Sequence, residues 1–341
     1  MLRNGKMKMI VLLVLMAGLV FFGCGGNGVE EATNGAEEVT EETDTPAEDT
    51  RYLAMATGGM AGTYYPLGGA LSNVINNNVP GVRVSVEATG ASVENLNLIG
   101  QGQSELALIA SNIGYSAYHG EGAFEGSPIE NVRGISRFFP ELVQIVTLEG
   151  SGINSVEDLA GKRVAVGDHG SGVEVMANFI LDVHGMSYDD LSQDFLGFSE
   201  AATGIQDRNI DAAFIWAGIP TAGVVDMATT NDIKIIQIEQ DKLAEIEAQL
   251  DYAASEVIPA GTYTGVDEDI MTIAIPALLV TDANLEDDIV YEITKAMFEN
   301  LESLTAMHER GRDVNIEQAM EGMSIPLHPG AERYLEEQGV L

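Results

Sequence analysis

The chain has 341 residues, of which 45% are hydrophobic, and its 53 acidic against 16 basic side chains give a formal net charge of −37 at pH 7. A surface this acidic repels phosphate backbones and anionic membrane surfaces, so we expect no nucleic-acid partner. The only cysteine is Cys24, which excludes an intrachain disulfide.

Residues 1–23 have the pattern of an export signal. Three basic residues precede an uncharged apolar run over residues 9–22, and Gly23-Cys24 follows. The run is shorter than the roughly 20 residues that a spanning helix needs. The segment resembles a bacterial lipoprotein signal, although phenylalanine at the two positions before Gly23 departs from the usual lipobox. The resemblance implies lipidation of Cys24 and an extracytoplasmic location; a buried structural cysteine is the alternative.

Residues 24–50 predict a solvated tether. The stretch 27–49 has nine acidic and no basic residues, a composition that cannot bury enough surface to offset the entropy of ordering. The excess of carboxylates is compatible with a saline medium or with affinity for cations or a basic partner. The remaining residues, from 51 to 341, exceed the usual size of a single core, so we expect two lobes.

The first predicted unit is a strand, a glycine loop and a helix. The apolar run 52–56 leads into a loop with Gly58, Gly59 and Gly62, and helical spacing of apolar residues follows Pro66. Such a loop points backbone N–H groups and the positive end of a helix at one place, which suits an anionic ligand. A plain structural turn is the alternative, although the hydroxyl groups of Thr63 and Tyr64 at its mouth favour binding.

The next two units repeat this order. Residues 82–86 alternate like a strand and are followed by a loop and a helix. Residues 106–110 form a short buried strand, after which Ser111-Asn112 leads into another predicted helix with Ile113 and Tyr115. Loops at the carboxyl ends of such strands converge on one crevice. We therefore expect Thr63, Tyr64, Ser92 and Asn112 to face the same space.

A second part of the chain has its own strands and glycine loop. Apolar runs predict strands at 143–147, 163–166, 212–216, 233–238 and 271–275, and Gly167 to Gly172 form a loop at the start of a helix. The last strand returns to the first part, so two chain crossings predict a hinge. Residues 289–308 have apolar side chains at helical spacing and predict one long helix that packs on the first part.

Taken together, the residues resemble the TAXI class of extracytoplasmic solute receptors of tripartite ATP-independent periplasmic (TRAP) transporters. The resemblance covers nearly all of residues 51–341 and depends on an ordered set of motifs, namely Gly59 to Tyr65, Ala88 to Asn95, Ser155 to Val166 with Gly170 to Gly172, Asp211 to Phe214 with Gly218 to Pro220, Ile258 to Tyr263, and Ile325 to Ala331. It implies an α/β fold of the type II periplasmic-binding-protein kind, with two lobes joined by a hinge around a ligand cleft. The lobes would comprise residues 51–145 plus 270–341 and residues 146–269. It also implies a small organic acid or amino acid ligand, such as glutamate, glutamine or 2-oxoglutarate, and TRAP membrane permease subunits as partners.

The glycine loops and the resemblance together give a set of expected ligand-binding residues: Gly59, Gly62, Thr63, Tyr64, Ser92, Asn95, Asn112, His169, Ser171, Gly172 and Trp216. Asn112 lies where the family often has an Asn-Asp pair, and the missing carboxylate favours a ligand without an amino group. His169 departs from the small residue or proline expected there, so a role in specificity and simple solvent exposure are both open. Trp216 could form a wall of the cleft, with core packing as the alternative.

No motif indicates an enzyme. The five histidines have no metal-ligand spacing, and no nucleophile elbow, dinucleotide-binding loop or P-loop is present. We therefore expect a binding protein without cofactor or metal. Two rivals stay open, a ligand sensor for a membrane kinase and a secreted hydrolase.

Overall fold

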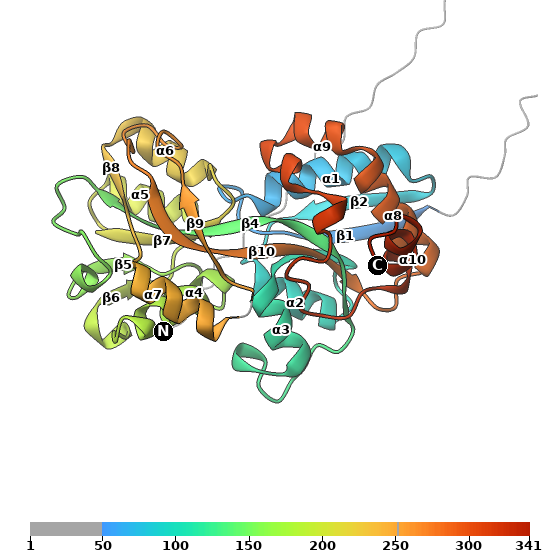
Figure 1. Ribbon diagram of the computed structural model, residues 1–341, viewed down its shortest axis with the longest axis horizontal. Helices are drawn as coiled ribbons and strands as arrows, with labels where there is room; N and C mark the ends of the chain where they lie inside the picture. The colour runs from blue at the N-terminus through green and yellow to red at the C-terminus, as the bar shows by residue number, and fades with distance from the viewer. Residues whose placement is uncertain (1–49, 251) are drawn as a thin grey trace, which may run out of the picture. The chain divides into compact units, whose positions relative to one another are not determined.

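The computed structural model describes residues 50–250 and 252–341 (Figure 1). The expected signal segment, Cys24 and the tether up to residue 49 lie outside the described residues. Of the helices within that part of the chain, none has the length and apolar character needed to cross a membrane.

The described chain contains ten strands in one sheet. They are β1 (Arg51–Ala56), β2 (Val82–Glu87), β3 (Leu106–Ala110), β4 (Val132–Leu148), β5 (Arg163–Ala165), β6 (Ser192–Asp194), β7 (Ala212–Ala217), β8 (Ile233–Ile236), β9 (Ala254–Ile258) and β10 (Ile270–Asp282). The α-helices are α1 (Tyr64–Asn78), α2 (Ser92–Gly100), α3 (Ser111–His119), α4 (Gly172–Val183), α5 (Phe198–Gln206), α6 (Ala222–Thr230), α7 (Gln240–Gln249), α8 (Asp287–Glu299), α9 (Leu301–Met307) and α10 (Pro329–Glu337).

Two long strands, β4 and β10, belong to both halves of the sheet (Figure 1). The first part of β4 pairs with β10, which also pairs with β3 beside the parallel strands β1 and β2. The second part of β4 pairs with β7 and β8, and β7 continues into the parallel strands β5 and β6. This is the two-part α/β fold of the periplasmic-binding-protein kind that the sequence predicts, and the expected strands at 143–147 and 271–275 are parts of these two crossing strands.

Strand β3 shows why the sheet needs helices on both faces. All five of its residues are buried. Leu106 and Leu108 join a core cluster with α1 and α8, whereas Ala107 and Ile109 join a second cluster with α2 and α3. Because successive side chains of a strand point to opposite faces, a continuous apolar run indicates a strand covered on both sides.

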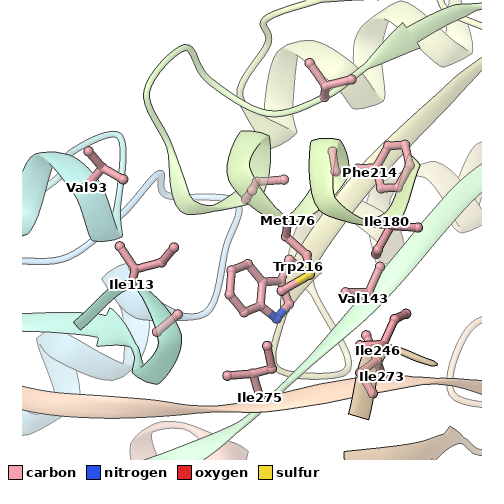
Figure 2. Packing of buried hydrophobic residues seen from close by; sticks show 14 of the residues in the cluster. Val93, Ile113, Val143, Met176, Ile180, Phe214, Trp216, Ile246, Ile273 and Ile275 are labelled. Carbon is pink, nitrogen blue, oxygen red and sulfur yellow. The ribbon is translucent and has the colours of Figure 1, made fainter. Parts of the chain in front are cut away.

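The second cluster continues into the other half of the sheet. Trp216 of β7 lies near Met176 of α4 and Ile275 of β10, with Ile113 of α3 close by (Figure 2). A third cluster forms around β7, α5 and α6. Side chains from both halves are therefore packed together at the middle of the sheet.

One sequence prediction about a helix is wrong. The expected long helix over 289–308 is two helices, because the chain breaks at Asn300, whose side-chain amide donates to the Ala296 carbonyl at 2.8 Å and so satisfies a carbonyl at the end of α8. The helix predicted after Ser111-Asn112 is present as α3, which begins at Ser111 directly after β3 ends and contains Ile113 and Tyr115.

Candidate functional site

Loops at the ends of strands β1, β2, β5 and β7 enclose one cavity with a volume of about 60 Å³. One water molecule needs roughly 10–15 Å³ of such space, so the cavity has room for a small ligand. It is lined by Gly58, Gly59, Gly62, Thr63, Tyr64, Thr89, Gly90, Ala91, Ser92, Glu141, Asp168, Ser171, Gly172, Val173, Phe198, Trp216 and Ala217.

The first glycine loop reaches across the sheet. The Gly62 amide donates to the Gly59 carbonyl at 3.0 Å, which forms a tight turn immediately before α1. The buried Thr63 hydroxyl donates to the Gly218 carbonyl after β7, also at 3.0 Å. Gly218 has no room for a side chain, because an added Cβ would lie 3.0 Å from the Phe139 ring and 3.1 Å from the Thr63 methyl group. The turn therefore joins the two halves of the sheet at the cavity.

The second loop is fixed by Asn95. This fully buried side chain donates to the Thr57 carbonyl at 2.6 Å and to the Leu108 carbonyl at 2.7 Å, and it accepts from the Thr89 hydroxyl at 2.6 Å. It does not line the cavity. Ala91 lines the cavity and has φ of 71° and ψ of −146°, a backbone conformation that residues other than glycine rarely adopt. Asn95 thus positions the loop, and Ala91 is held under strain at its tip.

The third loop brings α4 against α2. The Ser171 hydroxyl accepts from the Glu174 amide at 3.1 Å and caps α4. A Cβ at Gly172 would lie 3.3 Å from both Cβ and Oγ of Ser92. Ser92 begins α2 beside the first half of the sheet, and Gly172 begins α4 beside the second half. Their close approach makes the cavity narrow at this point.

A buried carboxyl group forms the floor of the site. Glu141 of β4 is 3% exposed, and one of its oxygens accepts a 2.7 Å hydrogen bond from the Tyr64 hydroxyl. Burial raises the pKa of Glu141 to about 8, against a smaller lowering by the Tyr64 hydrogen bond. Burial also raises the pKa of Tyr64, and the nearby Glu141 adds to this effect. Both effects favour the neutral forms of Glu141 and Tyr64 in this arrangement.

The remaining walls are apolar or acidic. Trp216 is 5% exposed, lines the cavity and donates from its indole nitrogen to the backbone carbonyl of Glu141 at 3.1 Å, so it combines both roles considered for it. Burial raises the pKa of Asp168, and Glu200 and Glu94 raise it further. No lysine, arginine or histidine is among the cavity-lining residues in the described part of the chain. Within the same residues, no group of three or more His, Cys, Asp or Glu side chains could hold a metal ion.

The structure brings together eight of the expected ligand-binding residues at this cavity: Gly59, Gly62, Thr63, Tyr64, Ser92, Ser171, Gly172 and Trp216. Three expected residues do not line it. Asn95 supports the loops, Asn112 lines a separate cavity with Tyr115 and Phe179, and the side chain of His169 is 81% exposed.

Sequence reasoning missed Glu141, Asp168 and Phe198 as cavity residues. A signal was available for Glu141, because it is a lone charge within the otherwise apolar stretch 138–143. Such a charge is seldom fully buried without a partner and so indicates a special environment.

A family model described as the NMT1-like family matches residues 55–339. The chain belongs to the NMT1-like family. Among solved structures, this NMT1-like chain is similar to the alkanesulfonate-binding protein SsuA from Xanthomonas axonopodis pv. citri bound to MOPS, with 14% identity over 85% of each chain and a TM-score of 0.48. It is also similar to a putative L-cystine ABC transporter protein from Listeria monocytogenes, with 14% identity over 80% of this chain and 99% of that one and a TM-score of 0.48.

Proposed function

We propose that this NMT1-like chain is an extracytoplasmic solute-binding receptor that captures a small organic anion, such as glutamate, 2-oxoglutarate or a similar carboxylate, and delivers it to an ion-coupled TRAP permease. The proposal includes membership of the TAXI class, an export signal over residues 1–23 and a lipid anchor at Cys24. The protein binds its ligand without chemical change.

One observation carries the proposal, namely that helices α1, α2 and α4 all begin at the same cavity. The N-cap residues of α1 and α2 make no side-chain cap hydrogen bond, so backbone N–H groups in the first turns are available as donors to a ligand. Free amides and the positive ends of helices bind carboxylates without a basic side chain. Among the described residues, the cavity lining contains no lysine or arginine, which is consistent with this mode of binding.

The mechanism is capture by closure of two lobes, residues 51–145 plus 270–341 and residues 146–269, around the crossing strands β4 and β10. The close approach of Gly172 to Ser92 and the Thr63 to Gly218 hydrogen bond fit a closed arrangement. A ligand that contacts both lobes shifts the population towards this closed form by its differential affinity.

A thermal-shift screen tests this function. Ligand-free protein would be screened against dicarboxylates, 2-oxo acids, amino acids and sugars, and a true ligand at 100 times its Kd adds about 2.7 kcal/mol to the free energy of unfolding, which raises Tm by several degrees. The shift should be lost in Tyr64→Ala and kept in the matched control Tyr52→Ala, because Tyr52 is 76% exposed. If no solute stabilises the folded, ligand-free protein, the proposed function is wrong.

A further inference from the structure

Glu141 presents a carboxyl group to the cavity, and no lysine, arginine or histidine among the described lining residues balances it. Its backbone is held in the middle of the sheet, opposite Ile275 of β10, and its carbonyl accepts from the Trp216 indole. The Tyr64 hydroxyl is the only side-chain hydrogen-bond partner observed for its carboxyl group in the described structure. No ion pair involves Glu141 among these residues.

The groups around Glu141 do not supply a positive charge. Helix α1 contributes the Tyr64 hydroxyl, β7 contributes Trp216, and β10 contributes Ile275. The only other titratable side chain that lines the cavity in the described chain, besides Tyr64, is Asp168, which is also acidic. An ionised carboxylate that is buried without a cation is unfavourable, and burial accordingly raises the pKa of Glu141.

We propose that Glu141 binds a primary ammonium group of the ligand and gives up its proton when it does so, while the uncapped starts of α1 and α2 hold the ligand's carboxylate. The inference rests on the proposed function, since it assigns the ligand of the same cavity. It narrows the ligand to a zwitterion of the amino acid type. The carboxylate missing beside Asn112, which argued against an amino group, is then supplied by Glu141 of β4, whereas Asn112 itself lies on α3 and lines a separate cavity.

The proton balance of binding is simple. The O–H bond of the Glu141 carboxyl breaks and its proton leaves to the buffer. The carboxylate formed then accepts hydrogen bonds from the ligand ammonium, which keeps its three protons. A 2-oxo acid has a carbonyl oxygen in place of the ammonium, so it cannot balance an ionised Glu141 and would leave the proton where it is.

Matched ligand pairs test this assignment. Isothermal titration calorimetry of the full chain at pH 7, in phosphate and in Tris, measures affinity and the number of protons released for L-alanine against pyruvate and L-glutamate against 2-oxoglutarate. We expect an amino acid to bind at least tenfold more tightly than its oxo partner and to release close to one proton. Its affinity should rise with pH from 6 to about 8 and then level off, because Glu141 is already ionised in the empty protein above its pKa of about 8.

Glu141→Gln keeps an acceptor for the Tyr64 hydroxyl but has no proton to release. This variant should abolish proton release and weaken amino acid binding at least tenfold, with little effect on the oxo acid. The control Glu130→Gln, at an exposed position outside the cavity, should behave like the parent protein.

The outcomes separate the two proposals. An oxo acid, or any acid without an ammonium group, that binds as tightly as its amino partner overturns the role of Glu141 and leaves the receptor function intact. The role is also overturned if amino acids bind without proton release or if Glu141→Gln keeps the preference. Failure of every solute to bind overturns the receptor function, and the assignment of Glu141 with it.

Discussion

Replacing Glu141 by glutamine should reveal how much the buried carboxyl costs the empty protein as pH rises. The substitution keeps the shape of the side chain and an oxygen for the Tyr64 hydroxyl, whose hydrogen bond to Glu141 is 2.7 Å long. It removes only the ability to ionise. The difference in unfolding free energy between Glu141→Gln and the parent protein therefore isolates this one titration from those of all the other carboxylates.

The raised pKa of Glu141 determines whether its carboxyl group makes the folded protein more or less stable as pH rises. In the folded protein burial raises the pKa of Glu141 from 4.5 to about 8, so between these values the folded state holds a proton that the unfolded state has lost. The free energy of unfolding of the parent protein then falls as pH rises through this window, by at most about 1.4 kcal/mol per pH unit. Over the whole window the carboxyl costs about 4–5 kcal/mol relative to glutamine, and the difference stays constant above about pH 8.

Urea unfolding at half-unit steps from pH 5 to 8.5 measures this difference, using protein freed of ligand by unfolding and refolding. Glu141→Gln should gain on the parent protein steadily up to about pH 8, while the exposed control Glu130→Gln should follow the parent curve. Parallel curves for Glu141→Gln and the parent protein would refute the reasoning. Such a result would mean that Glu141 titrates as an ordinary carboxyl and is ionised in the empty cavity.

Three further substitutions test the loops around the cavity. Gly172→Val crowds Ser92, because even a Cβ at this position would lie 3.3 Å from it. The variant should bind ligand at least tenfold more weakly, and its ligand-bound form should have a larger radius in small-angle scattering. Gly69→Val, with nothing within 4 Å of an added Cβ, should show neither effect. Ser171→Ala removes the cap of α4 and should lower the free energy of unfolding by about 0.5–2 kcal/mol in urea melts. Ala91→Gly relieves the positive φ of 71° and should raise the free energy of unfolding by about 1 kcal/mol, and a loss of stability would show that the position is unstrained.

Local sequence patterns predict those elements whose burial is decided by their own residues. Strands β1, β2 and β3 are short apolar or alternating runs, and glycine or polar turns mark the starts of α1 and α2. The first part of β4 was missed because Arg133, Arg137 and Pro140 interrupt its apolar pattern. Arg137 is tolerated there because it lies 3.7 Å from Glu321 and donates to the Asp313 carbonyl at 3.4 Å. Asp313 is 176 positions away in the chain, so no local window contains it.

The sequence predicted only those cavity residues that act through the conformation and amide groups of the backbone. Glycines and small hydroxyl residues at the ends of strands mark Gly62, Thr63, Ser92 and Gly172, because these loops need close backbone approach and free amides. Glu141 has no such signature, since its role depends on which elements enclose it. The sheet places it beside Tyr64 of α1, which is 77 positions away in the chain.

The charge of the whole protein bears on the ligand as well as the charge of the cavity. A net charge of −37 creates a negative field that slows the approach of a dianion such as 2-oxoglutarate, whereas a zwitterion with no net charge meets little repulsion. Inside the cavity the helix starts favour a carboxylate and Glu141 favours an ammonium. The net charge of the protein and the groups of the cavity therefore both favour a ligand that has a positive and a negative group but no net charge. An amino acid with a small uncharged side chain meets both requirements, and Phe198 and Trp216 give the cavity lining an apolar part. Of the two test pairs, alanine and pyruvate should therefore show the larger ratio of affinities.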